Sequence, residues 1–179
     1  GDNIFYGGDL PAKILKACKR DGCTIFCFPV TDAERFGVAE VALDGRVISI
    51  EEKPSNPKSN LAITGLYCFD NNAYDLALEI TPSKRGELEI TDLVRSYMNA
   101  NHLTSEKLMR GNAWFDAGTF ESLFEVSSFI RSVQNNTGLM VGNLEEIAFN
   151  KRWINENQLS KLANQMASNS YGQYLRNLT

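Results

Sequence analysis

Hydrophobic residues follow two different periods along this chain, and the change of period separates predicted strands from predicted helices. Alternating or unbroken apolar runs that are rich in β-branched and aromatic residues are typical of strands. The run at 23–30 is mostly apolar, which predicts a strand covered on both faces. Asp44 and Gly45 lie between two shorter runs, and this pair predicts a tight hairpin. The predicted strands cover 23–30, 38–43, 46–50, 61–69, 105–110 and 113–116.

Apolar residues spaced three or four positions apart predict the helices. The first has Asp9 as its N-cap and Pro11 in its first turn, and it runs to about Arg20. Thr91 is the predicted N-cap of another helix, over 93–99. The remaining predicted helices cover 71–78, 118–134, 145–151 and 155–167, whereas 171–175 shows no clear period.

The order of these elements predicts the fold class. Strands mix with helices until about residue 135, and the chain is helical from about residue 144. A hairpin combined with single strands predicts a mixed sheet in an α/β domain. The polar segment 135–143 is the candidate boundary, so we divide the chain into 1–135 and a helical C-terminal segment, 136–179.

Composition excludes several classes of function. The net charge is −4, with no basic stripe, so a nucleic acid is not an expected partner. The longest apolar run, 25–30, is too short to cross a membrane. Three of the four cysteines lie in apolar surroundings, which predicts buried thiols in a reducing compartment such as the cytoplasm. His102 is the single histidine, so a histidine-based zinc site is not expected.

Candidate chemistry appears first at residues 51–54, where two acids and a lysine end an apolar strand before Pro54. Lys53 can neutralise a phosphate, and the carboxylate of Glu52 can accept hydrogen bonds from sugar hydroxyls. The same residues also fit the solvated end of a hairpin strand, and this segment alone favours that plainer interpretation.

Two distant acids, Asp2 and Asp116, form the second candidate group. Each lies beside a polar turn or a segment of small residues. Magnesium prefers hard oxygen ligands and takes only one or two from protein when phosphate is also bound. Two converging carboxylates would hold Mg²⁺ against a nucleoside triphosphate, although either acid alone is more often a turn or N-cap residue.

Taken together and in order, the motifs resemble those of glucose-1-phosphate thymidylyltransferases, a branch of the sugar nucleotidyltransferases. The resemblance covers essentially the whole chain, and two of its motifs, GELEITD at 86–92 and YGQYL at 171–175, narrow it to the thymidylyltransferase branch. The motifs are GDN at 1–3, FGV at 36–38, EEKP at 51–54, KSN at 58–60, TGLY at 64–67, RGELEITD at 85–92, WFDAGT at 114–119, EEIAF at 145–149 and YGQYL at 171–175.

The resemblance implies a mixed-sheet, Rossmann-like nucleotidyltransferase fold that joins glucose 1-phosphate to dTTP. Residues 1–135 would be its sugar-phosphate and metal-binding part. Asp2 and Asp116 would ligate catalytic Mg²⁺, and Lys53 and Arg85 would bind the sugar phosphate. The sugar pocket would be lined by Asn3, Gly37, Glu52, Ile63, Thr64, Tyr67 and Trp114. Phe36 replaces a tyrosine that is common in relatives, which removes a hydroxyl and keeps the ring.

The resemblance also implies assembly and regulation. Relatives form homotetramers of dTDP-rhamnose biosynthesis that are regulated by a dTDP-sugar, so the segment 136–179 is expected to serve a subunit interface or regulation. Covering the sheet is an equally good explanation of its apolar residues. The implied regulatory residues are Tyr6, Gly7, Arg110, Gly111, Glu146 and Ile147.

One family motif has no counterpart in this chain. The glycine-rich loop that cradles the triphosphate precedes the GDN motif in relatives, and Gly7 and Gly8 lack its flanking cations. We therefore expect this chain to be a fragment of a longer enzyme and to be inactive alone. Alternatives are a fragment that binds sugar phosphate or dTDP-sugars without reaction, an oligomerisation element, or a transferase that uses another base.

Overall fold

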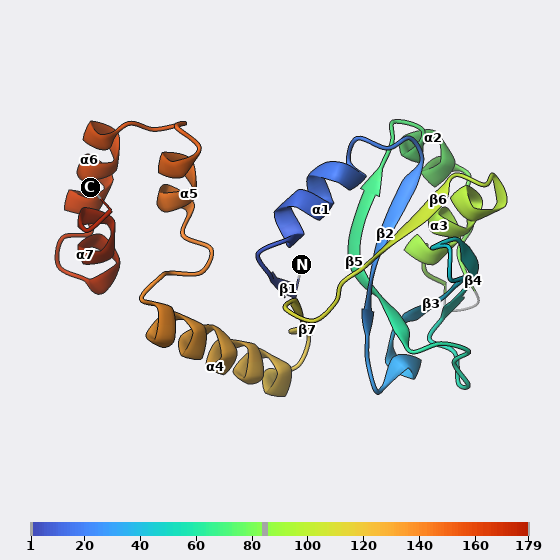
Figure 1. Ribbon diagram of the computed structural model, residues 1–179. Helices are drawn as coiled ribbons and strands as arrows, with labels where there is room; N and C mark the ends of the chain where they lie inside the picture. Colours follow the sequence, from blue (N-terminus) through green and yellow to red (C-terminus); the bar gives the residue numbers. More distant parts are fainter. Residues whose placement is uncertain (1, 84–85, 179) are drawn as a thin grey trace. The chain divides into compact units, whose positions relative to one another are not determined.

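The computed structural model describes residues 2–83 and 86–178, and the chain forms two compact units, Gly1–Leu123 and Phe124–Thr179 (Figure 1). The division lies within helix α4 (Phe120–Thr137), as does the boundary expected after residue 135. The roles expected for the two parts remain predictions.

The first unit contains a five-stranded mixed sheet in the order β4-β3-β5-β2-β6. Neighbouring strands are antiparallel except β2 and β6, which are parallel. The sheet is built from β2 (Cys23–Pro29), β3 (Gly37–Val41), β4 (Val47–Glu52), β5 (Leu61–Phe69) and β6 (Leu103–Lys107). Each of these strands overlaps a predicted one, so the expected α/β fold with a mixed sheet is confirmed.

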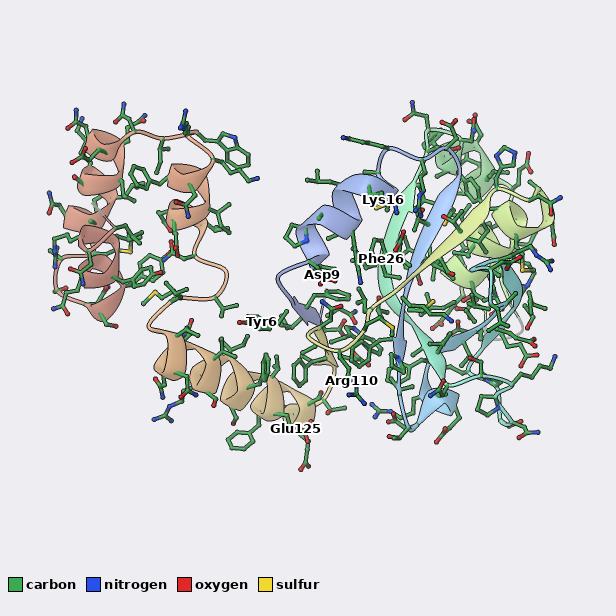
Figure 2. All side chains as sticks on the ribbon, in the orientation of Figure 1. Tyr6, Asp9, Lys16, Phe26, Arg110 and Glu125 are labelled. Atoms are coloured by element: carbon green, nitrogen blue, oxygen red, sulfur yellow. The ribbon has the colours of Figure 1, made fainter. Side chains whose placement is uncertain are left out.

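Helices cover both faces of this sheet, as the apolar run of β2 predicted (Figure 1). On one face, Ile25 and Cys27 pack with α3 (Ile90–Asn99) and α2 (Ala73–Leu78). On the other face, Phe26 packs with α1 (Leu10–Ala17), where Figure 2 labels it. Successive side chains of β2 thus enter different cores, because neighbouring residues of a strand point to opposite faces.

A bulge interrupts the pairing of β5 with β2. Ile25 pairs with Tyr67, but Cys27 pairs with Ile63, so three residues of β5 lie opposite Phe26 alone. Gly65, in the middle of the bulge, has φ +74°, a conformation that side chains rarely adopt. Bulges redirect side chains, and this one lies at the pocket described below.

A separate two-stranded antiparallel sheet joins the beginning of the first unit to its end. It consists of β1 (Asn3–Tyr6) and β7 (Ala113–Asp116), with Asn3 opposite Asp116 and Tyr6 opposite Ala113. Phe5 packs with Phe26 in the core beneath α1.

The second unit has a small core of its own, made by Leu159, Ala163 and Leu175. Helices α5 (Leu144–Asn150), α6 (Glu156–Gln165) and α7 (Ser170–Arg176) carry it, after the later part of α4. A capping box of Asn155 and Gln158 begins α6. Helix α7 covers 171–175, where the sequence pattern had no clear period.

Of the two predicted N-caps, Asp9 is confirmed in position and Thr91 is wrong. Asp9 is the N-cap residue of α1, but its side chain makes no capping hydrogen bond, because its carboxylate is held by Lys13 and Asn112. Thr91 lies inside α3, which begins one residue earlier, and its hydroxyl is used elsewhere. None of the helices in the described residues combines the length and the apolar character that a membrane span requires.

Candidate active site

The β1–β7 ribbon brings the two distant acids together. Asp116 is the last residue of β7 and lies opposite Asn3, next to Asp2 in sequence. The amide of Ala117 donates a 2.7 Å hydrogen bond to the carbonyl oxygen of Asp2, which fixes the segment before β1. Strand pairing alone therefore places two carboxylates side by side although the sequence separates them widely.

Gly118 lies directly between these carboxylates. A Cβ atom at this position would be 3.1 Å from Oδ2 of Asp2 and 3.3 Å from Oδ1 of Asp116. The two oxygens thus converge on one exposed point, and among the described residues neither acid forms an ion pair with lysine or arginine. The amide of Asn3 donates a 3.2 Å hydrogen bond to Oδ1 of Asp2, which leaves Oδ2 and the carboxylate of Asp116 as hard oxygen donors. Two such donors fit a magnesium ion that takes its other ligands from phosphate and water. The described chain holds no group of three acidic, histidine or cysteine side chains suited to a metal.

Next to Asp116 is a pocket of about 220 Å³. It gathers residues from both sheets and from α3, which the sequence spreads over more than a hundred positions. Its lining is Asn3, Arg35, Phe36, Gly37, Glu52, Lys53, Ile63, Thr64, Gly65, Tyr67, Ile90, Thr91, Trp114 and Asp116.

A carboxylate on β4 is the central polar group of one wall. Glu52 pairs with Gly37 across the β3–β4 hairpin, and it accepts a hydrogen bond from the hydroxyl of Thr91 at Oε2. A Cβ at Gly37 would be 3.2 Å from the same oxygen, so glycine keeps this backbone open. The bond from Thr91 orients the carboxylate and leaves Oε1 to accept from a ligand hydroxyl.

An aromatic cluster forms another wall. The indole nitrogen of Trp114 donates a 2.7 Å hydrogen bond to Oδ1 of Asn3. The ring of Phe36 meets Trp114 edge to face, with centroids 5.1 Å apart, and the guanidinium of Arg35 lies over Phe36. This series of side-chain contacts, from Arg35 through Phe36 and Trp114, therefore fixes the amide group of Asn3 at the pocket.

The bulged part of β5 contributes the pocket floor. Thr64 is fully buried, and its hydroxyl donates a 2.9 Å hydrogen bond to the carbonyl oxygen of Phe26. Gly65 approaches Asn3 closely, with 3.2 Å between an ideal Cβ and Nδ2. Burial raises the pKa of the Tyr67 phenol, and the nearby Glu52 carboxylate adds to the rise, so Tyr67 keeps its proton and can donate it.

Lys53 supplies a cation at the rim. Its side chain is exposed, and its amide donates to the carbonyl oxygen of Phe36. Its φ of +43° lies in the left-handed region, where a residue with a Cβ is strained. The other predicted cation, Arg85, lies outside the described residues.

The predicted regulatory residues fall in both units. Tyr6 ends β1, and Tyr6 and Arg110 are labelled near the β1–β7 ribbon in Figure 2. Gly7 lies against Asn112, and Gly111 has φ +93°. In the second unit, Glu146 accepts a 2.8 Å hydrogen bond from the hydroxyl of Tyr174, and its neighbour Ile147 is exposed. The regulatory role of all these residues remains a prediction.

Four features of the site were not predicted as such. Thr91 was interpreted as a helix cap, and its bond to Glu52 gave no signal in the sequence. Gly65 and Gly118 belong to recognised motifs, but only the fold reveals their close approaches to Asn3 and to the acids. Arg35 precedes a recognised motif, yet its place at the pocket depends on the turn before β3.

The fold and this arrangement of groups define the class of protein. A family model for nucleotidyl transferases matches residues 1–133, and the chain belongs to that family. Among solved structures, a UDP-glucose pyrophosphorylase complexed with UDP-glucose shares the fold, with a TM-score of 0.61 at 20% identity. That match covers 73% of this chain and 54% of the other.

More similar relatives carry a particular name. The chain is 48% identical over 179 residues to a glucose-1-phosphate thymidylyltransferase of Neisseria meningitidis, and 50% identical over 176 residues to one of Xanthomonas campestris. These alignments cover 99% and 98% of this chain, but 62% and 60% of the relatives. A Bacillus anthracis protein assigned as the same enzyme, solved in complex with sucrose, is 38% identical with a TM-score of 0.63, over 73% of this chain and 52% of that one. The chain thus spans about 60% of the length of the curated relatives it matches.

Proposed function

We propose that this chain supplies the sugar-phosphate and metal-binding part of a glucose-1-phosphate thymidylyltransferase, which makes dTDP-glucose and pyrophosphate from dTTP and glucose 1-phosphate. The observation that carries the proposal is the convergence of Asp2 and Asp116 on Gly118, beside a pocket that contains Glu52 and Lys53. The names of the relatives support the choice of substrates.

In this proposal the pocket holds the hexose by its hydroxyl groups. Glu52, which is oriented by Thr91, accepts a hydrogen bond from one sugar hydroxyl. The amide of Asn3, which is held in place by Trp114, binds a second sugar hydroxyl. Tyr67 donates from its protonated phenol. The backbone at Gly37 and Ile63 and the buried Thr64 complete the wall.

Lys53 and Arg85 bind the phosphate of the sugar, and their positive charges offset its negative charge. The attacking oxygen of a phosphate monoester is already ionised near neutral pH, so no strong general base is required. Catalysis then depends on orientation and on charge stabilisation at the reacting phosphates. No activated serine, cysteine or histidine faces the described pocket, in agreement with this chemistry.

Asp2 and Asp116 are the residues that would hold Mg²⁺. When bound, the ion supplies positive charge to the triphosphate and to the leaving pyrophosphate. The two carboxylates are kept available by the ribbon, because Asp2 is fixed by its backbone and Asp116 by strand pairing.

The chain spans about 60% of the length of its curated relatives, and we propose that by itself it binds the sugar phosphate without turnover. Thymidylyl transfer would require the glycine-rich segment found in the longer relatives. A base other than thymine is the alternative for the longer protein, because base recognition depends on that segment. Assembly as a homotetramer, regulation by a dTDP-sugar and a cytoplasmic location remain parts of the proposal.

Titration calorimetry of the chain with glucose 1-phosphate tests the binding step. We expect Lys53→Ala to weaken binding by about tenfold or more, since a charge-assisted hydrogen bond contributes roughly 1.5–3 kcal/mol. Alanine keeps the Cβ, so the strain at φ +43° is the same in both proteins. The change in affinity then reports the loss of the lysine side chain beyond Cβ, including its ammonium group.

Lys58→Ala is the matched control. This lysine is also exposed and lies shortly after Lys53, but it pairs with Glu51 at 2.9 Å and does not line the pocket. It should leave the affinity unchanged. Equal affinities for the wild type and Lys53→Ala, or equal losses in both variants, would contradict the assignment of Lys53.

A further inference from the structure

Two cysteines that do not line the pocket lie in direct contact. The sulfur atoms of Cys18 and Cys68 are 3.1 Å apart, although 50 residues separate them in sequence. Cys18 caps the C-terminal end of α1, and Cys68 lies near the end of β5. All four cysteines of the chain are free thiols.

The packing of α1 holds the two sulfurs at this separation. Ala17, next to Cys18, is 1% exposed and belongs to the same core cluster as Cys68 and Phe26. Figure 1 shows the C-terminal end of α1 beside β5. A disulfide bond is about 2.05 Å long, so bonding would move the sulfurs together by only about 1 Å. A helix end can make such a small shift, because Cys18 itself is exposed and, of its two neighbours in sequence, only Ala17 is buried.

Solvent reaches the pair from one side. Cys18 is exposed, whereas Cys68 is 8% exposed. Cys23 and Cys27 are 1% and 0% exposed, which shields them from an oxidant in solution. Burial also raises the pKa of the Cys68 thiol to about 12, so this thiol rests protonated and reacts poorly unless its neighbour is activated.

We propose that Cys18 and Cys68 form a reversible oxidation site for hydrogen peroxide. The Cys18 thiolate attacks the peroxide oxygen, the O–O bond breaks, and Cys18 becomes a sulfenic acid while hydroxide leaves. The sulfur of Cys68 then attacks the Cys18 sulfur, the S–O bond breaks, and the proton of Cys68 leaves with the oxygen as water. Two thiols are oxidised to one disulfide, and one peroxide is reduced.

The bond would join α1 covalently to β5. Strand β5 also carries Ile63, Thr64 and Tyr67 of the pocket, so oxidation would restrain the strand that supports the pocket floor. A cross-link between distant residues also restricts the unfolded chain, which predicts a higher Tm for the oxidised protein. The proposal stands apart from the proposed transferase activity, because it involves neither substrate nor metal.

The test is to treat the full chain with hydrogen peroxide and to measure intact mass and free thiols under denaturing conditions. We expect a mass loss of two hydrogen atoms, and a fall from four to two reactive thiols. Peptide mapping should find residues 18 and 68 linked, and dithiothreitol should restore the mass and the original Tm.

Variants separate this site from general thiol oxidation. Cys27→Ala removes a buried thiol and should still lose two hydrogens. Cys68→Ser should block the disulfide and leave Cys18 as the sulfenic or a higher acid, seen as a gain of oxygen. Cys18→Ser, an exposed and conservative change, should prevent the mass loss. Oxygen gain at Cys18 in the wild type without a disulfide, a link to another cysteine, or no change at all would overturn the proposal.

Discussion

Gly118 leaves room for the cation that the two acids of the candidate active site are proposed to share. Gly118 is exposed and has no positive φ, so alanine fits its backbone without strain. The new methyl group would, however, lie 3.1 Å from Oδ2 of Asp2 and 3.3 Å from Oδ1 of Asp116. We expect Gly118→Ala to leave Tm unchanged and to lower turnover of the full-length protein by about tenfold, or roughly 1.4 kcal/mol of barrier.

Pyrophosphate release in the presence of Mg²⁺ measures that effect. Gly8→Ala is the matched control, because a Cβ there meets nothing within 4 Å and its φ is not positive. The control should keep wild-type turnover. If Gly118→Ala keeps the wild-type rate and magnesium dependence, the carboxylate pair is not the cation site.

At this scale the sequence could predict which residues carry chemistry but not which contacts they make. Asp2 and Asp116 were paired as candidates from residue type and resemblance, and the strand register supplied the proximity. Thr91 has the side chain of an N-cap, yet its hydroxyl donates to Glu52 on β4. Asp9 is the N-cap residue of α1, but its carboxylate accepts from Asn112, 103 residues away, and not from the helix amides. Partners this distant in sequence cannot be identified from the residues around each side chain.

At the scale of elements, Asp70 joins four of them and makes their packing sensitive to acid. Its carboxylate accepts from the hydroxyl of Tyr97 on α3 at 2.6 Å, from the amide of Gly22 before β2 at 2.8 Å, and from the amide of Asn72 before α2 at 3.0 Å. These bonds, that from Tyr97 first, hold the pKa of Asp70 below its usual value of 3.8. The folded chain therefore binds this proton less readily than the unfolded chain.

The contribution of Asp70 to the free energy of unfolding should then be fully present above about pH 4. It should be lost as the pH falls through the lowered pKa of its carboxyl. We expect Asp70→Asn to lower the urea midpoint at pH 7 and to flatten its dependence on pH below 4. Asp75→Asn, on the exposed side of α2, should change neither. Urea titrations between pH 3 and pH 7 compare the three proteins, and parallel pH profiles for the wild type and Asp70→Asn would refute the role.

Elements were the most predictable level of the structure. All five strands of the main sheet, and β7 of the ribbon, overlap predicted strands. The apolar run of β2 gave the clearest signal, because a strand buried on both faces has few polar positions, whereas β6 and β7 showed only weak alternation. The sequence pattern did not predict β1 or α7. β1 is short, and the polar positions of α7 reflect a helix that buries only Gly172 and Leu175. The bulge at Gly65 also escaped prediction, since its register depends on the partner strand.

At the scale of the whole molecule, each compact unit has its own core. Leu175 is fully buried with Leu159 and Ala163, and all three belong to the second unit. We expect Leu175→Ala to destabilise that unit by about 2–5 kcal/mol, because truncating a buried leucine leaves a cavity. The affinity for glucose 1-phosphate should remain that of the wild type, since every described pocket residue belongs to the first unit.

Thermal unfolding and calorimetry on the same protein check both parts of this expectation. Leu178→Ala, a partly buried residue at the edge of the same cluster, should give a smaller loss of stability. A loss of sugar-phosphate affinity together with the stability of the second unit would show that the two cores are not independent.

The β1–β7 ribbon also has a consequence for the order of folding. Its contacts, such as that between Asn3 and Trp114, join residues 111 positions apart, whereas the β3–β4 hairpin closes within a few. Closing a long loop costs more chain entropy than closing a short one, and that cost must be met before the contacts form. The ribbon should therefore assemble after the hairpin has nucleated the main sheet. A nascent chain would complete the core between the sheet and α3 first, and the ability to chelate the proposed cation would mark the last stage of its maturation.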